Sequence, residues 1–204
     1  MTATTPSAHG RTRLSPDARR EQLIELGLEL FSGGSLEDIS IDRLAEAGGV
    51  SRGLLYHYFG SKQGFHEAVV QRAADDLVAQ TAPPEGADPV DRLHASMAAY
   101  VDYVVAQEEG YRSLVRAAAG GHETLRRIYE GARAVMIDRV FSSDSLGEVI
   151  VDTPGSRLAV RSWAALAEEA VLAWCADPAG IERDELVRYV TDALPALIGV
   201  VPRP

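Results

Sequence analysis

From Ser40 to Lys62 the chain reads SIDRLAEAGGVSRGLLYHYFGSK, and this stretch decides the fold of the region around it. It predicts two short helices joined by a tight glycine turn, with a third helix following at once. Ser40 and Ser51 are of a residue type that caps helix N-termini. Gly49 stands where the chain must turn sharply with a positive φ, which glycine adopts at little cost. We therefore expect a helix-turn-helix, whose second helix enters the major groove of DNA.

The apolar residues of this stretch fit the same layout. Ile41, Leu44 and Ala45 have the i, i+3, i+4 spacing of a buried helical stripe. We expect Ala45 to be small because the second helix crosses close to it, and we expect Val50 and Leu55 to fill the angle between the two helices.

The second helix, from Ser51 to about Tyr58, carries a glycine in its interior. Gly53 destabilises the helix by about 1 kcal/mol relative to alanine, but it lets the backbone come close to whatever lies against that face. Breaking a local rule in this way is expected at a functional surface. The aromatic residues that follow are either core residues or DNA contacts. For Phe59 we favour the core; for Tyr56 and His57, which share an arc with Gly53 and Arg52, we favour contact with phosphates or bases.

At these residues the chain resembles the TetR family of bacterial transcriptional regulators. The resemblance runs from about Arg19 to Val70, and a combination of about ten positions is far more specific than one short motif. Gly48 and Gly60 depart mildly from the family pattern, which more often has alanine and proline there. The positions that carry the resemblance are Leu44-Ala45, Gly49-Val50-Ser51, Leu55-Tyr56, Tyr58-Phe59, and Ser61-Lys62.

The resemblance implies roles for individual residues of this stretch. Arg52, Gly53 and Leu54 would lie against base edges, and Arg52 suits direct readout because arginine can donate two hydrogen bonds to guanine. Lys62, the only lysine of the chain, would hold a phosphate at the start of the third helix, although an ordinary solvated charge is the alternative. The candidate DNA contacts are Ser40, Ser51, Arg52, Gly53, Leu54, Tyr56, His57 and Lys62.

The net charge of −10 is distributed unevenly along the 204 residues. Residues 1–72 carry eight Lys/Arg and nine Asp/Glu, whereas residues 73–204 carry twelve and twenty-one. The acidic excess therefore lies mostly away from the proposed DNA-binding end. Residues 1–14 are expected to form a disordered basic arm, in which Arg11 and Arg13 either reach DNA or belong to a solubilising tail.

The composition also limits the classes of protein to consider. The single cysteine, Cys175, permits neither an intramolecular disulfide nor a multi-cysteine metal site, and we interpret it as a small core residue. No apolar run is long enough to span a membrane, and no signal peptide is visible. We expect a cytoplasmic protein without a cofactor.

Helical patterns and breaks predict an all-α chain of about nine helices. Residues 15–80 would form the DNA-binding domain with its connecting helix, and residues 81–204 a ligand-binding and dimerisation domain. A proline-rich break at 82–89 separates them. The predicted helices beyond this break are 89–107, 111–119, 122–141, 155–176 and 183–199, divided among other places at Gly110 and at Gly120-Gly121.

The last two predicted helices carry more apolar surface than one small lobe needs. Their side chains either serve the internal core or form a two-fold interface with a second copy, as a four-helix bundle. Because TetR-like proteins dimerise through their last two long helices, we favour the interface. The candidate residues are Trp163, Leu166, Ala170, Trp174, Leu186, Val190, Leu194 and Leu197.

The middle helices are expected to enclose a pocket for a small apolar or amphipathic ligand. Tyrosines and methionines on an apolar wall suit such a molecule, although any single member is more often plain core. An anionic ligand would have Arg116 or His122 as candidate partners. The candidate pocket residues are Met97, Tyr100, Tyr103, Tyr111, Tyr129, Met136 and Trp163.

These features favour a ligand-responsive transcriptional repressor that binds an inverted-repeat operator as a homodimer. The alternative is a DNA-binding dimer whose C-terminal lobe docks protein partners without a small molecule. An enzyme is not expected. His66 and Glu67, or Glu168 and Glu169, are adjacent pairs whose side chains diverge by about 100° on a helix, and the sequence has no nucleophile elbow, phosphate loop or zinc-ligand spacing.

Overall fold

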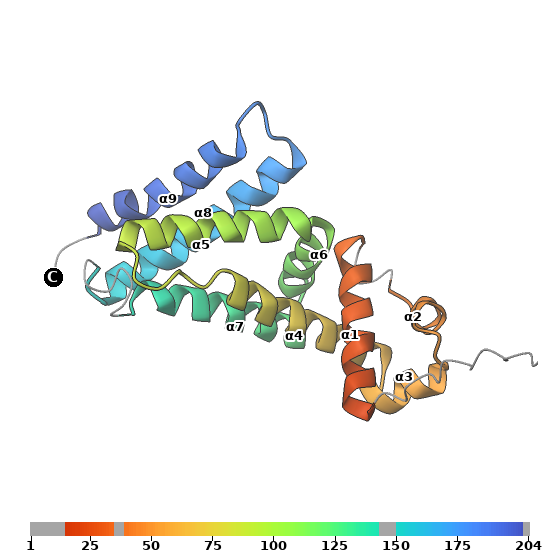
Figure 1. The fold of residues 1–204 in the computed structure, drawn as a ribbon. Coiled ribbons are helices and arrows are strands. Elements are labelled where there is room, and N and C mark those ends of the chain that lie inside the picture. Colours follow the sequence, from red (N-terminus) through yellow and green to blue (C-terminus); the bar gives the residue numbers. More distant parts are fainter. Residues whose placement is uncertain (1–14, 35–38, 143–149, 202–204) are drawn as a thin grey trace, which may run out of the picture.

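The computed structural model describes residues 15–34, 39–142 and 150–201. All regular structure in these residues is helical and comprises nine helices, which confirms the all-α prediction (Figure 1). The arm predicted over residues 1–14 lies outside the described residues. The helices are α1 (Pro16–Ser32), α2 (Ile41–Gly48), α3 (Arg52–Phe59), α4 (Lys62–Gln80), α5 (Pro89–Ala106), α6 (Glu108–Ala119), α7 (Glu123–Val140), α8 (Pro154–Ala176) and α9 (Arg183–Gly199).

Helices α1 to α3 and the start of α4 form one end of the molecule, and α8 and α9 lie at the other end (Figure 1). The apolar core at the first end is built from every helix there and includes Leu23, Leu44, Leu55 and Phe65, and it extends to Leu114 of α6 and Leu125 of α7. Helix α4 leaves this core and continues between α5 and α7 into the second lobe. One continuous helix therefore joins the first end to the second lobe.

The boundary between α5 and α6 differs from the sequence prediction. Gly110 does not end a helix: the chain turns at Gln107, and α6 already begins at Glu108. Gly110 is buried where α6 approaches α1, and a Cβ atom added to it would lie 2.6 Å from the carbonyl oxygen of Phe31. The glycine is needed for this close approach, and glycine spacing along the sequence does not distinguish that need from a helix break.

Candidate DNA interface and ligand cavity

The helix-turn-helix forms through the serine caps and the glycine turn that the sequence predicts. The backbone N–H of Arg43 donates to Ser40 Oγ at 3.1 Å, and the backbone N–H of Leu54 donates to Ser51 Oγ at 3.2 Å. Between the two helices Gly49 is left-handed, with φ of 59°. Each capping hydroxyl only accepts in these bonds, so its own proton stays available to a phosphate oxygen.

The buried side of the motif matches the sequence prediction. Ile41, Leu44 and Leu55 are buried in the core of the first lobe, and Val50 packs against it. Phe59 also packs there, with its ring 5.0 Å from the ring of Phe65. Burial of these side chains fixes which face of α3 points away from the protein.

The outward face of α3 carries the residues assigned to DNA. Arg52, Gly53 and His57 are exposed, as is Tyr56 at 49% of its surface, whereas Leu54 is half-buried. A Cβ atom added to Gly53 would meet nothing nearer than Ser51 Oγ at 3.9 Å. The protein itself therefore gives no packing reason for a glycine at this position.

Arg52 forms an ion pair with Asp42 of α2, and both side chains are mostly exposed. An exposed ion pair contributes about 0 to 1 kcal/mol, so exchanging it for a base or a phosphate costs little. The pair joins the two helices of the motif across its outer surface.

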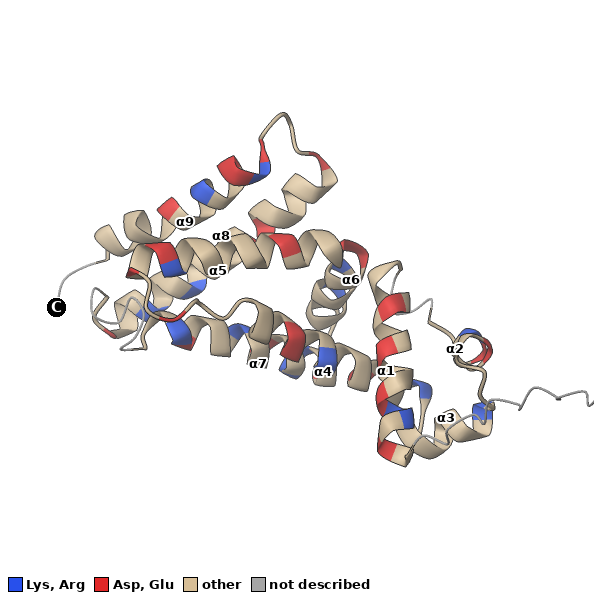
Figure 2. Cartoon of the chain, in the orientation of Figure 1, with Lys and Arg blue, Asp and Glu red and all other residues tan. Residues whose placement is uncertain are grey.

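Lys62 opens α4 directly after the Ser61 cap, whose Oγ accepts from the backbone N–H of Gly64 at 2.9 Å. This N-terminus follows the C-terminal end of α3 after Gly60 and Ser61, and the free backbone N–H groups of a helix N-terminus together with a cation suit a phosphate. Figure 2 shows Lys and Arg on α2, α3 and the start of α4 at this end of the molecule, together with acidic residues on α1 and α2.

A cavity of about 110 Å³ lies in the second lobe, among α4, α5, α6, α7 and α8. All seven residues assigned to a pocket from the sequence line this one cavity: Met97, Tyr100, Tyr103, Tyr111, Tyr129, Met136 and Trp163. Arg116 and His122, the candidate partners of an anion, do not line it. Its charged groups among the described residues are instead Arg92, Arg133, Arg139 and Glu168.

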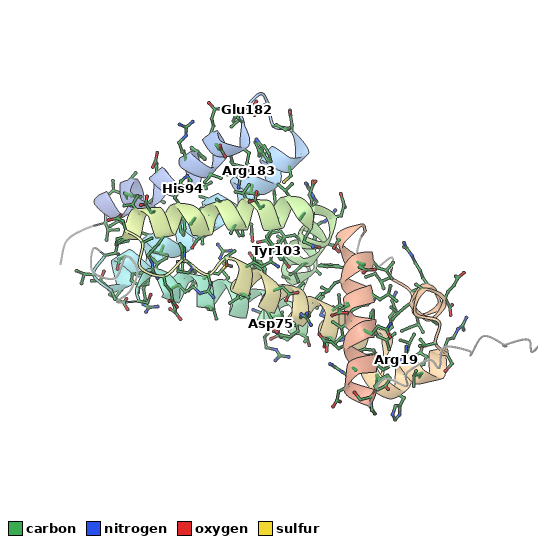
Figure 3. All side chains as sticks on the ribbon, viewed as in Figure 1. Arg19, Asp75, His94, Tyr103, Glu182 and Arg183 are labelled. Carbon is green, nitrogen blue, oxygen red and sulfur yellow. The ribbon has the colours of Figure 1, made fainter. Side chains whose placement is uncertain are left out.

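Helix α4 provides one wall of the cavity through Ala73, Ala74 and Leu77. The hydroxyl of Tyr103, on the facing wall, donates to the carbonyl oxygen of Ala73 at 2.7 Å. In Figure 3 Tyr103 lies between α5 and α4. Phe31, at the end of α1, also reaches the cavity. Two helices of the DNA-binding end therefore line the same space as the tyrosines.

Three of the cavity tyrosines form a hydrogen-bonded group around Glu168. Tyr111 and Tyr129 donate to its carboxylate at 2.9 and 2.8 Å, and Tyr100 lies 3.0 Å from the Tyr111 hydroxyl. Burial, and then the nearby Glu168, raise the pKa of Tyr129 to about 12. Burial also raises the pKa values of Tyr100 and Tyr111. All three are therefore neutral donors at physiological pH.

Sequence reasoning missed the arginines and the glutamate of this cavity. A charged residue on a helix is ordinarily solvated, and no local pattern marks one that faces inward. Glu168 follows the buried Ala167 and precedes the exposed Glu169, so its position relative to the core follows only from how α8 packs.

The eight residues assigned to a dimer interface lie in two different environments. Trp163, Leu186, Val190 and Leu194 are buried inside the chain, and the Trp163 indole donates to the Val190 carbonyl at 2.7 Å. These four are core residues, because α8 and α9 pack on each other and on α5. Leu166, Ala170, Trp174 and Leu197 are only half-buried. Large apolar side chains that are exposed on the two helices are Leu158 at 67% and Tyr189 at 58%.

Among the described residues, no helix is both long enough and apolar enough to cross a membrane.

Two family models match the chain. The model of bacterial regulatory proteins of the tetR family matches residues 23–69, and that of the tetracyclin repressor-like C-terminal domain matches residues 89–197. The crystal structure of a tetR-family transcriptional regulator from Streptomyces coelicolor is similar to this structure, with a TM-score of 0.82 and 34% sequence identity. The similarity covers 92% of this chain and 83% of that one.

Named relatives match over shorter stretches. The transcriptional activator FasR of Mycolicibacterium smegmatis is 35% identical over 102 residues, which are 49% of this chain and 47% of FasR. The regulator BetI 1 of Chromohalobacter salexigens is 42% identical over 59 residues, 29% of each chain. The matches thus span less than half the length of either relative. Both family models, together with the structural similarity over 92% of this chain, show that the chain belongs to the TetR family of DNA-binding transcriptional regulators, which are not enzymes.

Proposed function

We propose that this protein is a homodimeric repressor that binds an inverted-repeat operator and leaves it when a small molecule enters the cavity. The observation that carries the proposal is the course of α4. This helix begins at Lys62, packs against α3, and forms a wall of the cavity with its second half through Ala73, Ala74 and Leu77. A molecule in the cavity therefore touches the helix that supports the DNA-binding end.

The size of the cavity supports a ligand effect on α4. Its volume of about 110 Å³ is below the roughly 300 to 1,000 Å³ of pockets that hold drug-sized ligands. Such a ligand must separate the walls, and α4 is held to the facing wall by the hydrogen bond between Tyr103 and Ala73. A ligand that prefers the separated arrangement shifts the population toward it, and the two α3 helices then no longer fit successive grooves.

A homodimer is supported by the geometry of DNA recognition and by the surface of α8 and α9. Two copies of α3 must reach half-sites about 34–36 Å apart, and α8 and α9 lie at the end of the molecule away from α3 (Figure 1). Their exposed side, with Leu158 and Tyr189, is the surface we assign to the second copy. The buried faces of Leu186 and Leu194 already serve the chain's own core.

A C-terminal lobe that docks only protein partners would need no internal space. The cavity, with four charged and several hydroxyl-bearing side chains in its walls, favours the small-molecule interpretation over this alternative.

Selection of bound DNA from a random pool tests the operator assignment. We expect enrichment of one inverted repeat whose half-sites are about one helical turn apart, or a multiple of it.

Light scattering tests the dimer and should give the mass of two chains. Tyr189→Asp should reduce this mass to that of a monomer. Tyr56→Asp should abolish DNA binding and leave the dimer intact. Enrichment of a single half-site, or a monomeric wild type at working concentration, would contradict the proposal.

Filling the cavity tests ligand release separately. Ala164 lies in the cavity wall, and Ala164→Phe should leave operator affinity unchanged while removing release by any small molecule that acts on the wild type. Ala165→Phe, on the exposed side of the same helix, is the matched control for the added ring. If Ala164→Phe responded to that molecule as the wild type does, the cavity would not be the site of release.

A further inference from the structure

The tyrosines around Glu168 form a chain of hydrogen bonds in the wall of the cavity. Tyr111 donates to Glu168 Oε2 at 2.9 Å, and Tyr129 donates to the same carboxylate at 2.8 Å. Each phenol has a single proton, and Tyr111 uses its proton for Glu168. Tyr100, whose hydroxyl lies 3.0 Å from that of Tyr111, must therefore be the donor in this pair. The protons of all three hydroxyls are thus committed within the group.

Tyr100 is the first member of this chain. Its hydroxyl donates to Tyr111, and it accepts from no other member of the group. Tyr100 is buried and lines the cavity, and a hydroxyl oxygen has lone pairs that can accept. A donor that reached Tyr100 Oη from the cavity would extend the chain, in which successive hydrogen bonds strengthen one another. This wall therefore offers the cavity an acceptor.

The charge in this wall is balanced within the chain. Arg133 Nη1 lies 3.9 Å from the Glu168 carboxylate and donates to the Tyr129 hydroxyl at 2.8 Å. Its Nη2 donates to the carbonyl oxygen of Arg161 at 3.3 Å. A cationic group placed here would lie beside the guanidinium, and an anionic group would lie beside the carboxylate. Because either group would lose its hydration beside a like charge, a neutral group is favoured at this wall.

The other residues that line the cavity are mostly apolar. They come from four helices and include Leu77 of α4, Met97 of α5, Leu114 of α6 and Met136 of α7. Hydrocarbon that contacts these side chains is removed from water, which contributes about 25 cal/mol for each Å² buried. Methionine side chains also adapt to molecules of different shape. The cavity therefore suits a largely apolar body.

We propose that the regulatory ligand is a neutral, largely apolar molecule with a hydroxyl group that donates a hydrogen bond to Tyr100. This inference rests on the proposed function, because it names the chemical class of the molecule that enters the same cavity. The hydroxyl group distinguishes the ligand from an ether or a hydrocarbon of the same size. An ether oxygen can only accept, so it would place its lone pairs against those of Tyr100 Oη.

Calorimetric titration without DNA tests the ligand class. The probes are 1-octanol, its isomer heptyl methyl ether, octanoate and octylammonium, each kept below the concentration at which it separates or forms micelles. We expect octanol to bind the wild-type protein roughly two- to tenfold more tightly than the ether, because one hydrogen bond is gained. The two ions should bind at least about tenfold more weakly than octanol, because their charges are desolvated. Ala164→Phe should abolish the binding of octanol.

Tyrosine variants locate the hydroxyl group of the ligand. Tyr100→Phe keeps the ring but removes the acceptor, so octanol and the ether should bind this variant with equal affinity. Tyr103→Phe is the matched control, because Tyr103 also lines the cavity but its hydroxyl donates to the Ala73 carbonyl outside the group. It should preserve the preference for octanol over the ether. The ratio of the two affinities is the readout, so a general change in the cavity walls cancels.

The outcomes separate this inference from the proposed function. Equal binding of octanol and the ether by the wild type, or an unchanged preference in Tyr100→Phe, would overturn the hydroxyl class. So would an ion that bound as tightly as octanol, even if it released the operator, and so would the absence of binding by all four probes. If octanol bound with the expected dependence on Tyr100 but left the operator complex intact, the ligand class would stand and the proposed release would fail.

Discussion

Gly110 of α6 lies against the backbone of Phe31 at the end of α1, so closely that a Cβ atom on the glycine would be 2.6 Å from the Phe31 carbonyl oxygen. This contact joins the second lobe to the first helix of the DNA-binding end. Phe31 also lines the cavity, so the junction lies between the cavity and the helices of the DNA-binding end. Because the close partner is backbone, a side chain at Gly110 cannot be accommodated by a change of rotamer alone.

Gly110→Ala should therefore destabilise the protein, although alanine is the better helix former. We expect a loss of about 1 to 3 kcal/mol in unfolding free energy from overpacking, together with weaker operator binding as α1 shifts. Gly131→Ala is the matched control, because Gly131 is also inside a helix and an added Cβ would meet nothing within 4 Å. It should stabilise the protein by up to about 1 kcal/mol. Urea unfolding of both variants measures the difference, and equal effects would contradict the assignment of Gly110.

Gly53→Ala should change stability and DNA binding in opposite directions. A Cβ atom fits at this position, so the helix should gain up to about 1 kcal/mol. If the α3 backbone approaches a base edge or phosphate at Gly53, the added methyl group should weaken operator binding by tenfold or more, a factor that corresponds to about 1.4 kcal/mol. Thermal unfolding and fluorescence anisotropy with labelled operator measure the two effects. Unchanged operator affinity would show that this face does not lie close to DNA.

Arg52 and Lys62 should differ in how their loss affects recognition. Arg52→Ala should cost about 1–3 kcal/mol and relax the preference at one base position. Lys62→Ala should weaken binding to all sequences alike and reduce the salt dependence of affinity by about one phosphate contact. Binding to the selected operator and to its single-base variants, at several salt concentrations, separates the two. A salt-only effect for Arg52 would place it on a phosphate.

The junction between α2 and α4 should lose stability in acid. His66 Nε2 lies 3.0 Å from the Ile39 carbonyl oxygen, which fits a neutral ring that donates there. Burial lowers the pKa of His66 below its ordinary 6.5, and the nearby Lys62 and His122 lower it further. The unfolded chain binds the proton more readily than the folded chain. The stability that neutral His66 contributes is therefore fully present above pH 6.5 and is lost as the pH falls through the lowered pKa. His66→Gln should flatten that part of the pH profile of unfolding free energy, and an unchanged profile would be the contrary result.

Tyr103→Phe should loosen the attachment of α4 to α5. It removes the hydrogen bond to Ala73 and should cost about 0.5 to 1.5 kcal/mol of stability. If, as we propose, this bond keeps the cavity walls in the DNA-binding arrangement, operator affinity without ligand should fall as well. Urea unfolding and operator binding without ligand measure the two effects. Greater operator affinity in Tyr103→Phe would contradict this role of the bond.

Local sequence was sufficient for the DNA-binding motif because its determinants act over a few residues. Ser40, Ser51 and Ser61 each accept from a backbone N–H three positions later, and Gly49 has the positive φ of the turn. Burial of Leu44 and Leu55 then fixes which side of α3 faces outward. The tyrosines and methionines of the cavity were also predictable as a group, because large amphipathic side chains recur on the inner faces of the middle helices.

Only the tertiary structure decided which face of each long helix is buried within the chain. Leu186 and Leu194 have the spacing of an interface, but the packing of α8, α9 and α5 buries them inside one chain. The sequence predicts surface positions for the charged residues Arg92, Arg139 and Glu168, but they line a common cavity. It predicts a helix break at Gly110, but this glycine is a point of close packing. Each of these positions depends on contacts between segments far apart in the chain. The free energy of such contacts is not encoded in the spacing of neighbouring residues.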